Sequence, residues 1–248
     1  MNRFQRWHEL TAQVDGYFSD EAAATWDVLL DVQETRFLGA LGEIGVYHGR
    51  SAALLALHTR DQEHLSLVDL DERPDRTRFL RDLLKGNQFF FSVDRSSHLS
   101  GMPGPGGLHR FRWFHIDGDH TGEALVNDLR LASEALQDEG IVCLDDFFSP
   151  MYPQLTAATF HYLAAHPHEL VLFLCGFNKG YLCRPTAAAR YQHVIRSGLI
   201  TELSKRGISN VTVFKTTSSA DMACFGMGPK WKDYDYYGWD ADPSELPL

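Results

Sequence analysis

Short apolar runs alternate with amphipathic stretches along most of the chain after residue 39. We predict strands over 37–45, 64–70, 89–93, 111–117, 141–147 and 169–176, and a late strand pair over 210–216 and 221–226. Helices are predicted between them, over 50–60, 74–85, 121–138, 153–166 and 187–206. This alternation is typical of βαβ units, which build a mostly parallel sheet covered by helices.

The two ends of the chain follow other patterns. Before residue 39, FQRWHELTAQV precedes a Ser19 or Asp20 cap and the helical pattern EAAATWDVLLDVQE. We therefore expect a helical cap (1–38), a main α/β domain (39–228) and an aromatic, acidic tail (229–248). GMPGPGG, at 101–107, contains too much Gly and Pro for regular structure and is predicted to be a surface loop.

Composition limits the class of partner. The chain has 248 residues, a 44% hydrophobic content and a net charge of -10. This length suits one large domain, and the acidic surplus argues against a broad nucleic-acid surface. No apolar run approaches the roughly 20 residues of a membrane span, and MNRFQRWHEL lacks the apolar stretch of a secretory signal. We expect a cytoplasmic protein that binds a small molecule, and we also consider a homodimer or higher homo-oligomer.

The first predicted strand leads into a glycine-containing turn before a helix. Glu43, Gly45 and Gly49 form Glu-x-Gly-x-x-x-Gly. Glycines let the backbone approach a ligand, and the free amides at a helix start favour a carboxylate or phosphate. The spacing differs from the dinucleotide pattern Gly-x-Gly-x-x-Gly, and by itself it also fits an ordinary tight turn. Asp69 ends the next strand, where an acid can accept hydrogen bonds from ribose hydroxyls, whereas Asp71 begins a polar turn.

Two later strands also end in acidic side chains. HIDGDH places Asp117 at the end of one, and LDDF places Asp145 and Asp146 at the end of the next. Because the carboxyl ends of parallel strands share one edge, we expect these carboxylates to gather near the glycine loop and to hold a divalent cation such as Mg²⁺. Asp145 and Asp146 can share an ion only if the chain turns there, which FFSP favours. Alternatively, Asp119 caps the next helix, and one of Asp145 and Asp146 forms a hydrogen bond with the backbone.

Two histidines belong to the same motif. His120 lies three residues after Asp117, and an imidazole that titrates near neutrality can take a proton from a hydroxyl group. We therefore interpret His120 as a general base. His115 is expected to be buried by strand alternation or to lean toward the opposite face.

Together these motifs resemble the class I S-adenosylmethionine (SAM) dependent methyltransferases. Within that family they are similar to macrocin-type sugar O-methyltransferases and their catechol-methyltransferase-like relatives. The resemblance runs from about Gly16 to Cys183, through GEIGVYHGRSA, LVDLD, HIDGDHTGEALVNDLRLASEALQDEGIVCLDDF and FNKGYLC. It implies an α/β, Rossmann-like class I methyltransferase fold, with a mostly parallel seven-stranded sheet flanked by helices.

The resemblance also implies roles for individual residues. Gly45 and Gly49 would lie against the methionine part of SAM, with Glu43 holding its amino group and Asp69 the ribose. The sequence DRS at 94–96 would lie on the adenine side. The expected cofactor-binding set is Glu43, Gly45, Tyr47, Gly49, Ser51, Asp69, Asp94, Ser96 and Asp117. The expected metal ligands are Asp117, Asp145 and Asp146, whereas Asn178 and Lys179 receive only a structural role.

These features predict methyl transfer from SAM to a hydroxyl group of a small molecule, such as a natural product or a sugar. The metal would lower the pKa of the hydroxyl while His120 removes its proton.

Two alternatives stay open. HIDGDH has the spacing of the His-x-His-x-Asp-His motif of binuclear metallohydrolases with one ligand changed, and a SAM-binding protein need not methylate. The tail aromatics are predicted to form a lid or to pack on the domain or a second subunit: Trp231, Tyr234, Tyr236, Tyr237 and Trp239.

Overall fold

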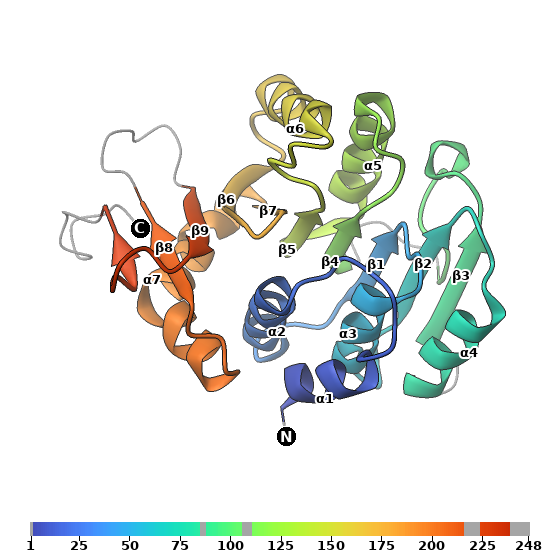
Figure 1. The fold of residues 1–248 in the computed structure, drawn as a ribbon. Helices are drawn as coiled ribbons and strands as arrows, with labels where there is room; N and C mark the ends of the chain where they lie inside the picture. The colour runs from blue at the N-terminus through green and yellow to red at the C-terminus, as the bar shows by residue number, and fades with distance from the viewer. Residues whose placement is uncertain (1, 85–87, 106–110, 216–223, 239–248) are drawn as a thin grey trace.

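The computed structural model describes residues 2–84, 88–105, 111–215 and 224–238, which form one twisted sheet with helices on both faces (Figure 1). The strands are β1 (Ala40–Ile44), β2 (Leu65–Asp69), β3 (Phe89–Val93), β4 (Phe111–Ile116), β5 (Leu136–Leu144), β6 (Val171–Gly176), β7 (Lys179–Cys183), β8 (Val211–Phe214), β9 (Phe225–Pro229) and β10 (Tyr236–Tyr237). The helices are α1 (Arg3–Leu10), α2 (Asp20–Glu34), α3 (Arg50–His58), α4 (Pro74–Leu83), α5 (Gly122–Ala135), α6 (Pro153–Ala165) and α7 (Pro185–Lys205).

The strand order is β10-β8-β9-β6-β7-β5-β4-β1-β2-β3. Strands β1 to β5 are mutually parallel, and β7 runs antiparallel to both β5 and β6. Chain order reverses between β1 and β4, because β1 leads to β2 on one side and β4 leads to β5 on the other. Open α/β sheets bind ligands outside the carboxyl ends of strands at such a reversal. The topology therefore directs attention to the ends of β1 and β4.

The predicted α/β fold with a mostly parallel sheet is confirmed, but the sheet is wider than the seven strands expected. FNKGYLC contains β7, which inserts between β5 and β6. The late pair forms as β8 and β9, although 216–223 lies outside the described residues. The helix predicted over 121–138 ends at Ala135, because the chain continues directly into β5 at the fully buried Leu136.

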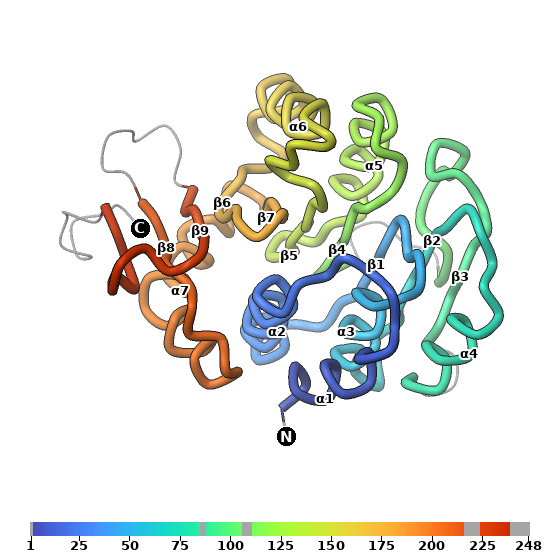
Figure 2. The backbone as a smooth tube through the Cα atoms, in the orientation of Figure 1, coloured from blue at the N-terminus to red at the C-terminus, as the bar shows by residue number. Residues whose placement is uncertain are grey.

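The N-terminal cap packs into the main core. Ser19 caps α2, as predicted, by accepting a hydrogen bond from the amide of Ala22. Trp7 and Trp26 are 0% exposed and belong to the same hydrophobic cluster as Trp113 of β4. The tube in Figure 2 shows the loop between α1 and α2 passing beside the start of α3. The cap therefore continues the core, because large aromatic side chains gain most of their stabilisation from such burial.

None of the described helices has the length and apolar character needed to cross a membrane.

Candidate functional site

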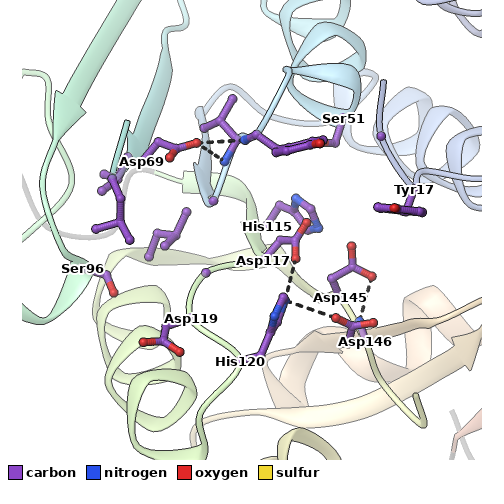
Figure 3. A pocket seen from close by; sticks show the side chains of 18 of the residues that line it. Tyr17, Ser51, Asp69, Ser96, His115, Asp117, Asp119, His120, Asp145 and Asp146 are labelled. Atoms are coloured by element: carbon purple, nitrogen blue, oxygen red, sulfur yellow. Dashed lines mark hydrogen bonds and ion pairs between the residues drawn. The ribbon is translucent and has the colours of Figure 1, made fainter. Parts of the chain in front are cut away.

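A cavity of about 830 Å³ opens at the carboxyl ends of β1, β2, β4 and β5 (Figure 3). Its lining includes the turn after β1, the ends of β2 and β4, and the segment after β5. The predicted site residues that line it are Gly45, Tyr47, Ser51, Asp69, Asp94, Ser96, Asp117, His120, Asp145 and Asp146. Gly49 belongs to the turn after β1 and Glu43 to β1 itself, and neither lines the cavity. The sheet thus brings most of the predicted residues to one place.

The glycine turn lies directly against the end of β4. Gly45 has a φ of +81°, and a Cβ atom there would stand 1.7 Å from the carbonyl oxygen of Asp117. Gly49, with a φ of +86°, is the N-cap of α3. Both positions require glycine, because an added side chain is strained at such angles. Tyr47 has a φ of 49°, so the turn holds a non-glycine residue in the left-handed region as well.

Asp69 fastens this turn. Its Oδ2 accepts hydrogen bonds from the amides of Val46 and Tyr47, at 2.9 and 2.8 Å. The same oxygen is 2.9 Å from Nη1 of Arg76, a buried residue of α4 that also donates to the carbonyl oxygen of Tyr47. Oδ1 accepts from the amide of Asp71 at 3.1 Å. The structure therefore shows a loop-holding role for Asp69, whereas its contact with ribose stays a prediction. No sequence motif pointed to Arg76.

Glu43 lies behind the cavity wall. Its side chain is 0% exposed, and its Oε1 accepts a hydrogen bond from Ser51 Oγ at 2.5 Å and lies 2.7 Å from His115 Nδ1. The register of the sheet places Glu43 beside His115 on the neighbouring strand. The contact between Glu43 and the amino group of SAM stays a prediction. His115 is buried, as predicted, but it also lines the cavity.

The acid pair after β5 has the predicted turn. Strand β5 ends at Leu144, and Asp146 has a φ of 52°. Asn178 Nδ2 donates to Asp146 Oδ1 at 2.8 Å and to Asp145 Oδ1 at 3.2 Å, so one amide bridges both carboxylates. The amide of Asp146 donates to the same Asp145 oxygen at 2.7 Å. The pair therefore faces one region of space although its members are adjacent in sequence.

Lys179 also joins this cluster and forms an ion pair with Asp145. Burial opposes ionisation of Asp145, but Lys179 and His115 hold its pKa below the usual value. Burial likewise disfavours the charged form of Lys179, and Asp145 reverses the effect and raises its pKa. The sequence placed Asn178 and Lys179 in a structural role only. Their position follows from the antiparallel insertion of β7, which was not predicted.

His120 points toward two carboxylates (Figure 3). Its Nε2 is 3.6 Å from Asp117 Oδ1 and 3.3 Å from Asp146 Oδ2, and its ring stacks on Tyr152 with centroids 4.1 Å apart. The interaction with Asp117 raises the pKa of His120 in spite of partial burial. Burial is the main factor that raises the pKa of Asp117 to about 6, with Asp145 adding to it and His120 opposing it. Each group therefore stabilises the charged form of the other.

Carboxylate and imidazole atoms here converge as metal ligands do. Among the described residues that line this cavity, two sets have atoms within 4.8 Å of one another: His115 with Asp117 and Asp145, and Asp117 with His120 and Asp146. The predicted triad of Asp117, Asp145 and Asp146 is thus divided between two sets that share Asp117. Lys179 supplies one positive charge beside these acids, so a surplus of negative charge is left. Oxygen donors with surplus charge fit a hard divalent cation.

The remaining predicted residues lie at the other end of the cavity. Asp94 Oδ1 accepts from the amide of Arg95 at 2.7 Å and lies 2.9 Å from His98 Nδ1, so it shapes the turn after β3. Ser96 begins the short 3₁₀ helix Ser96–His98. Their contact with adenine stays a prediction. Asp119 is exposed, and Thr121 rather than Asp119 caps α5.

The N-terminal cap contributes a wall that no motif indicated. Residues 15–18 line the cavity, and the Tyr17 side chain is 99% exposed, across from the carboxylates (Figure 3). Arg50, in the first turn of α3, holds this segment by donating to the carbonyl oxygens of Thr11 and Val14, at 3.3 and 3.2 Å. We call residues 11–18 the N-terminal strap. It connects the cap to the glycine turn.

Comparisons with solved structures identify the fold. The O-methyltransferase NovP has a TM-score of 0.52 and 17% identity, over 66% of this chain and 80% of that chain. A putative O-methyltransferase from Klebsiella pneumoniae has a TM-score of 0.50 and 15% identity, over 73% and 88%. A Corynebacterium glutamicum protein from structural genomics has a TM-score of 0.51 and 14% identity, over 73% and 89%. At such low identities the similarity concerns the fold.

A family model gives the more specific result. Residues 43–147, from the glycine turn to the end of the acid pair, match the model described as a methyltransferase domain. No curated protein matches the chain by sequence. Residues 43–147 are thus similar to a methyltransferase domain, as the motifs indicated, and the α/β fold is shared with these solved structures.

Proposed function

We propose that the protein is a SAM-dependent O-methyltransferase that acts on a hydroxyl group of a small molecule, such as a natural product or a sugar. The observation that carries this proposal is one cavity that contains both the glycine turn and the His120–carboxylate cluster. Its volume of about 830 Å³ lies within the range of small-molecule sites. A cofactor at the turn would therefore present its methyl group to an acceptor held beside His120.

His120 is the proposed general base. Asp117 and Asp146 lie within 4 Å of its Nε2, so they stabilise the imidazolium that forms when the ring takes the hydroxyl proton. Tyr152 fixes the ring plane by stacking. The cavity then has to align the acceptor oxygen with the methyl carbon, and such positioning supplies much of the acceleration in a transfer reaction.

The proposed divalent cation, Mg²⁺ or a similar ion, would be held by Asp117, Asp145 and Asp146. When bound, it lowers the pKa of the acceptor hydroxyl and orients its oxygen. Lys179 already balances Asp145. Asp117 and Asp146 therefore carry most of the charge that a cation would neutralise. Nε2 of His120 is assigned to the proton and not to the ion, because one lone pair cannot serve both.

The two alternatives differ in how well they agree with the structure. A binuclear hydrolase would use His115 and His120 as neighbouring ligands, but His115 Nδ1 contacts Glu43 and the two histidines fall into different sets. The match to a methyltransferase domain also favours methyl transfer. A SAM-binding protein that does not methylate differs from the proposal only in turnover, and an activity assay separates the two.

Calorimetry with S-adenosylhomocysteine (SAH) tests cofactor binding. We expect wild-type protein to bind SAH with micromolar affinity and Gly45→Arg to abolish binding, because the new side chain meets the backbone of Asp117. Gly198→Arg is the matched control, since nothing lies within 4 Å of a Cβ at that position. Absence of binding heat with the wild-type protein would refute the assignment of SAM as the cofactor.

Methyl transfer from labelled SAM to sugar and phenol acceptors, measured with and without EDTA, tests turnover and metal assistance. Activity that EDTA does not change contradicts the proposed role of the divalent cation.

A further inference from the structure

Two partly exposed cysteines meet near the carboxyl end of β6. Cys175 is the penultimate residue of that strand, and Cys224 immediately precedes β9, which pairs with β6 in parallel. Their Sγ atoms are 4.0 Å apart. The other two cysteines, Cys143 and Cys183, are 0% exposed. Cys175 and Cys224 are therefore the two thiols that contact each other and are also open to a reagent in solvent.

The two thiols differ in their acidity. The thiol of Cys224 donates to the sulfur of Cys175, which lowers the pKa of Cys175 although burial opposes the change. The same contact, together with burial, raises the pKa of Cys224. Lys215, whose Nζ donates to the carbonyl oxygen of Cys224 at 3.3 Å, opposes this increase. A partly exposed thiol with a lowered pKa and a second thiol beside it are the features of a cysteine pair that responds to oxidants.

Cys175 leads directly into the turn that carries Asn178. Strands β6 and β7 pair up to the residues on either side of Phe177 and Asn178, which form a two-residue hairpin turn with φ of 50° and 64°. Positive φ at both central residues defines a tight turn whose backbone has little freedom. Gly176 also lies against β9, because a Cβ atom there would stand 2.3 Å from the carbonyl oxygen of Met227. A movement between β6 and β9 is therefore passed to the turn.

Asn178 in turn holds the acid pair. Its Nδ2 donates to Asp145 and Asp146, at 3.2 and 2.8 Å. A disulfide bond is about 2 Å long, whereas the sulfur atoms of Cys175 and Cys224 are 4.0 Å apart. Joining these atoms requires the two segments to move toward each other. The start of the turn then has to move with Cys175.

We propose that Cys175 and Cys224 form an oxidative modification site, in which hydrogen peroxide produces a disulfide that lowers turnover by displacing Asn178 from the acid pair. The Cys175 thiolate first attacks a peroxide oxygen, the O–O bond breaks, and a sulfenic acid forms while the other oxygen leaves as hydroxide. The Cys224 thiolate then attacks this sulfur and expels a second hydroxide. The protons lost by the two thiols convert both hydroxides to water. The effect on turnover rests on the proposed function, whereas the disulfide does not.

Peptide mapping tests whether the disulfide forms. The wild-type protein is treated with hydrogen peroxide, digested without reduction and analysed by mass spectrometry. We expect a cross-link between Cys175 and Cys224, with Cys143 and Cys183 still reduced because both are buried. Cys224→Ser should stop at a sulfenic acid on Cys175, which a dione probe traps, and Cys175→Ser should leave Cys224 reduced. Oxidation of the wild-type protein without this cross-link overturns the proposal.

Two further measurements test the coupling to the acid pair. The side-chain amide signal of Asn178 in NMR spectra should shift on oxidation and return with dithiothreitol, and Asn178→Asp identifies the signal. The kcat for methyl transfer should fall about 10- to 100-fold on oxidation, because misplacement by about 1 Å costs rate on that scale. Cys175→Ser and Cys224→Ser should keep their turnover under the same treatment. These variants also control for oxidation of Met151, which lines the cavity and is 74% exposed.

The outcomes are distinguishable. A cross-link that leaves the Asn178 signal and kcat unchanged overturns the coupling. An equal loss of turnover in the wild-type protein and in both serine variants assigns the loss to another site and also overturns it. Absence of methyl transfer in the reduced wild-type protein refutes the proposed function instead, and the peptide map and the Asn178 signal still test the modification site.

Discussion

Buried charges gather at both ends of the central strands, but the two groups differ in how they are paired. At the amino end, Arg112 is 0% exposed and contacts both oxygens of Glu63, at 2.8 and 3.1 Å. His58 lies between Asp27 and Glu34, at 2.8 and 2.7 Å. We call this group the amino-end network; its members are Asp27, Gln33, Glu34, His58, Arg60, Glu63, Arg112 and Arg206.

At the carboxyl end the pairing is incomplete. Lys179 pairs with Asp145, whereas Asp117 and Asp146 lie beside the partly exposed His120, and Nε2 of His115 has no partner within the described residues. The pKa values show the contrast. Burial opposes ionisation of Glu63, yet Arg60 and Arg112 lower its pKa to about 2, whereas burial raises that of Asp117 to about 6. Pairing of Glu63 with two arginines stabilises the fold, whereas the incomplete pairing at the carboxyl end leaves polar groups ready for ligands.

The largest expected effect is on catalysis at the carboxyl end. His120→Ala should lower kcat about 100- to 10,000-fold, the usual contribution of a general base. Affinity for SAH should change little, because the ring faces the acceptor side. Steady-state kinetics and calorimetry measure the two effects. An equal loss in both would place His120 in cofactor binding rather than in proton transfer.

The next effect concerns stability at the amino end. Arg112→Met should cost about 3–5 kcal/mol in the free energy of unfolding, because it leaves the Glu63 carboxylate buried beside Arg60 alone. Arg130→Met removes an exposed i,i+4 pair with Glu134 and should cost less than about 0.5 kcal/mol. Urea unfolding measures both variants. Similar values for the two would contradict the difference between paired core charges and surface charges.

Low pH should weaken the pairing of Glu63 with Arg60 and Arg112. Because the pKa of Glu63 falls from 4.5 to about 2 on folding, its contribution is complete above pH 4.5 and is lost as the pH falls toward 2. The contribution amounts to about 3 kcal/mol. Urea unfolding of wild type and Glu63→Gln should therefore give a difference that shrinks over this interval. A difference independent of pH would show that Glu63 does not titrate as described.

The smallest effect has the opposite sign. The pKa of Asp117 is raised on folding from 3.8 to about 6, so its ionised form costs stability above that pH. Asp117→Asn should raise the free energy of unfolding at pH 8 by about 0.5–2 kcal/mol, as other active-site substitutions do, while activity falls. The gain should disappear below pH 4, where the carboxyl group is neutral in both states. A loss of stability at pH 8 would contradict incomplete pairing.

The sequence correctly predicted which side chains gather at the carboxyl ends of the strands, because the motifs lie where the parallel topology brings strand ends together. The glycine turn and the acids at the ends of β2, β4 and β5 are local signals, and parallel strands bring them to one edge. Contacts across strands were harder to foresee. Glu43 and His115 meet through the register of β1 and β4, and Asn178 reaches the acid pair because β7 inserts beside β5. The part of the cavity wall formed by residues 15–18 was not predicted, because it arises from tertiary packing and no local motif marks it.

The N-terminal strap also bears on the synthesis of the protein. The strap leaves the ribosome before the residues it faces across the cavity, Asp145 and Asn178, which come more than a hundred positions later. Arg50 can hold the strap early, because α1 and α3 are close in the chain and in contact. We expect the nascent chain to form this wall first and to complete the cavity when β7 joins the sheet.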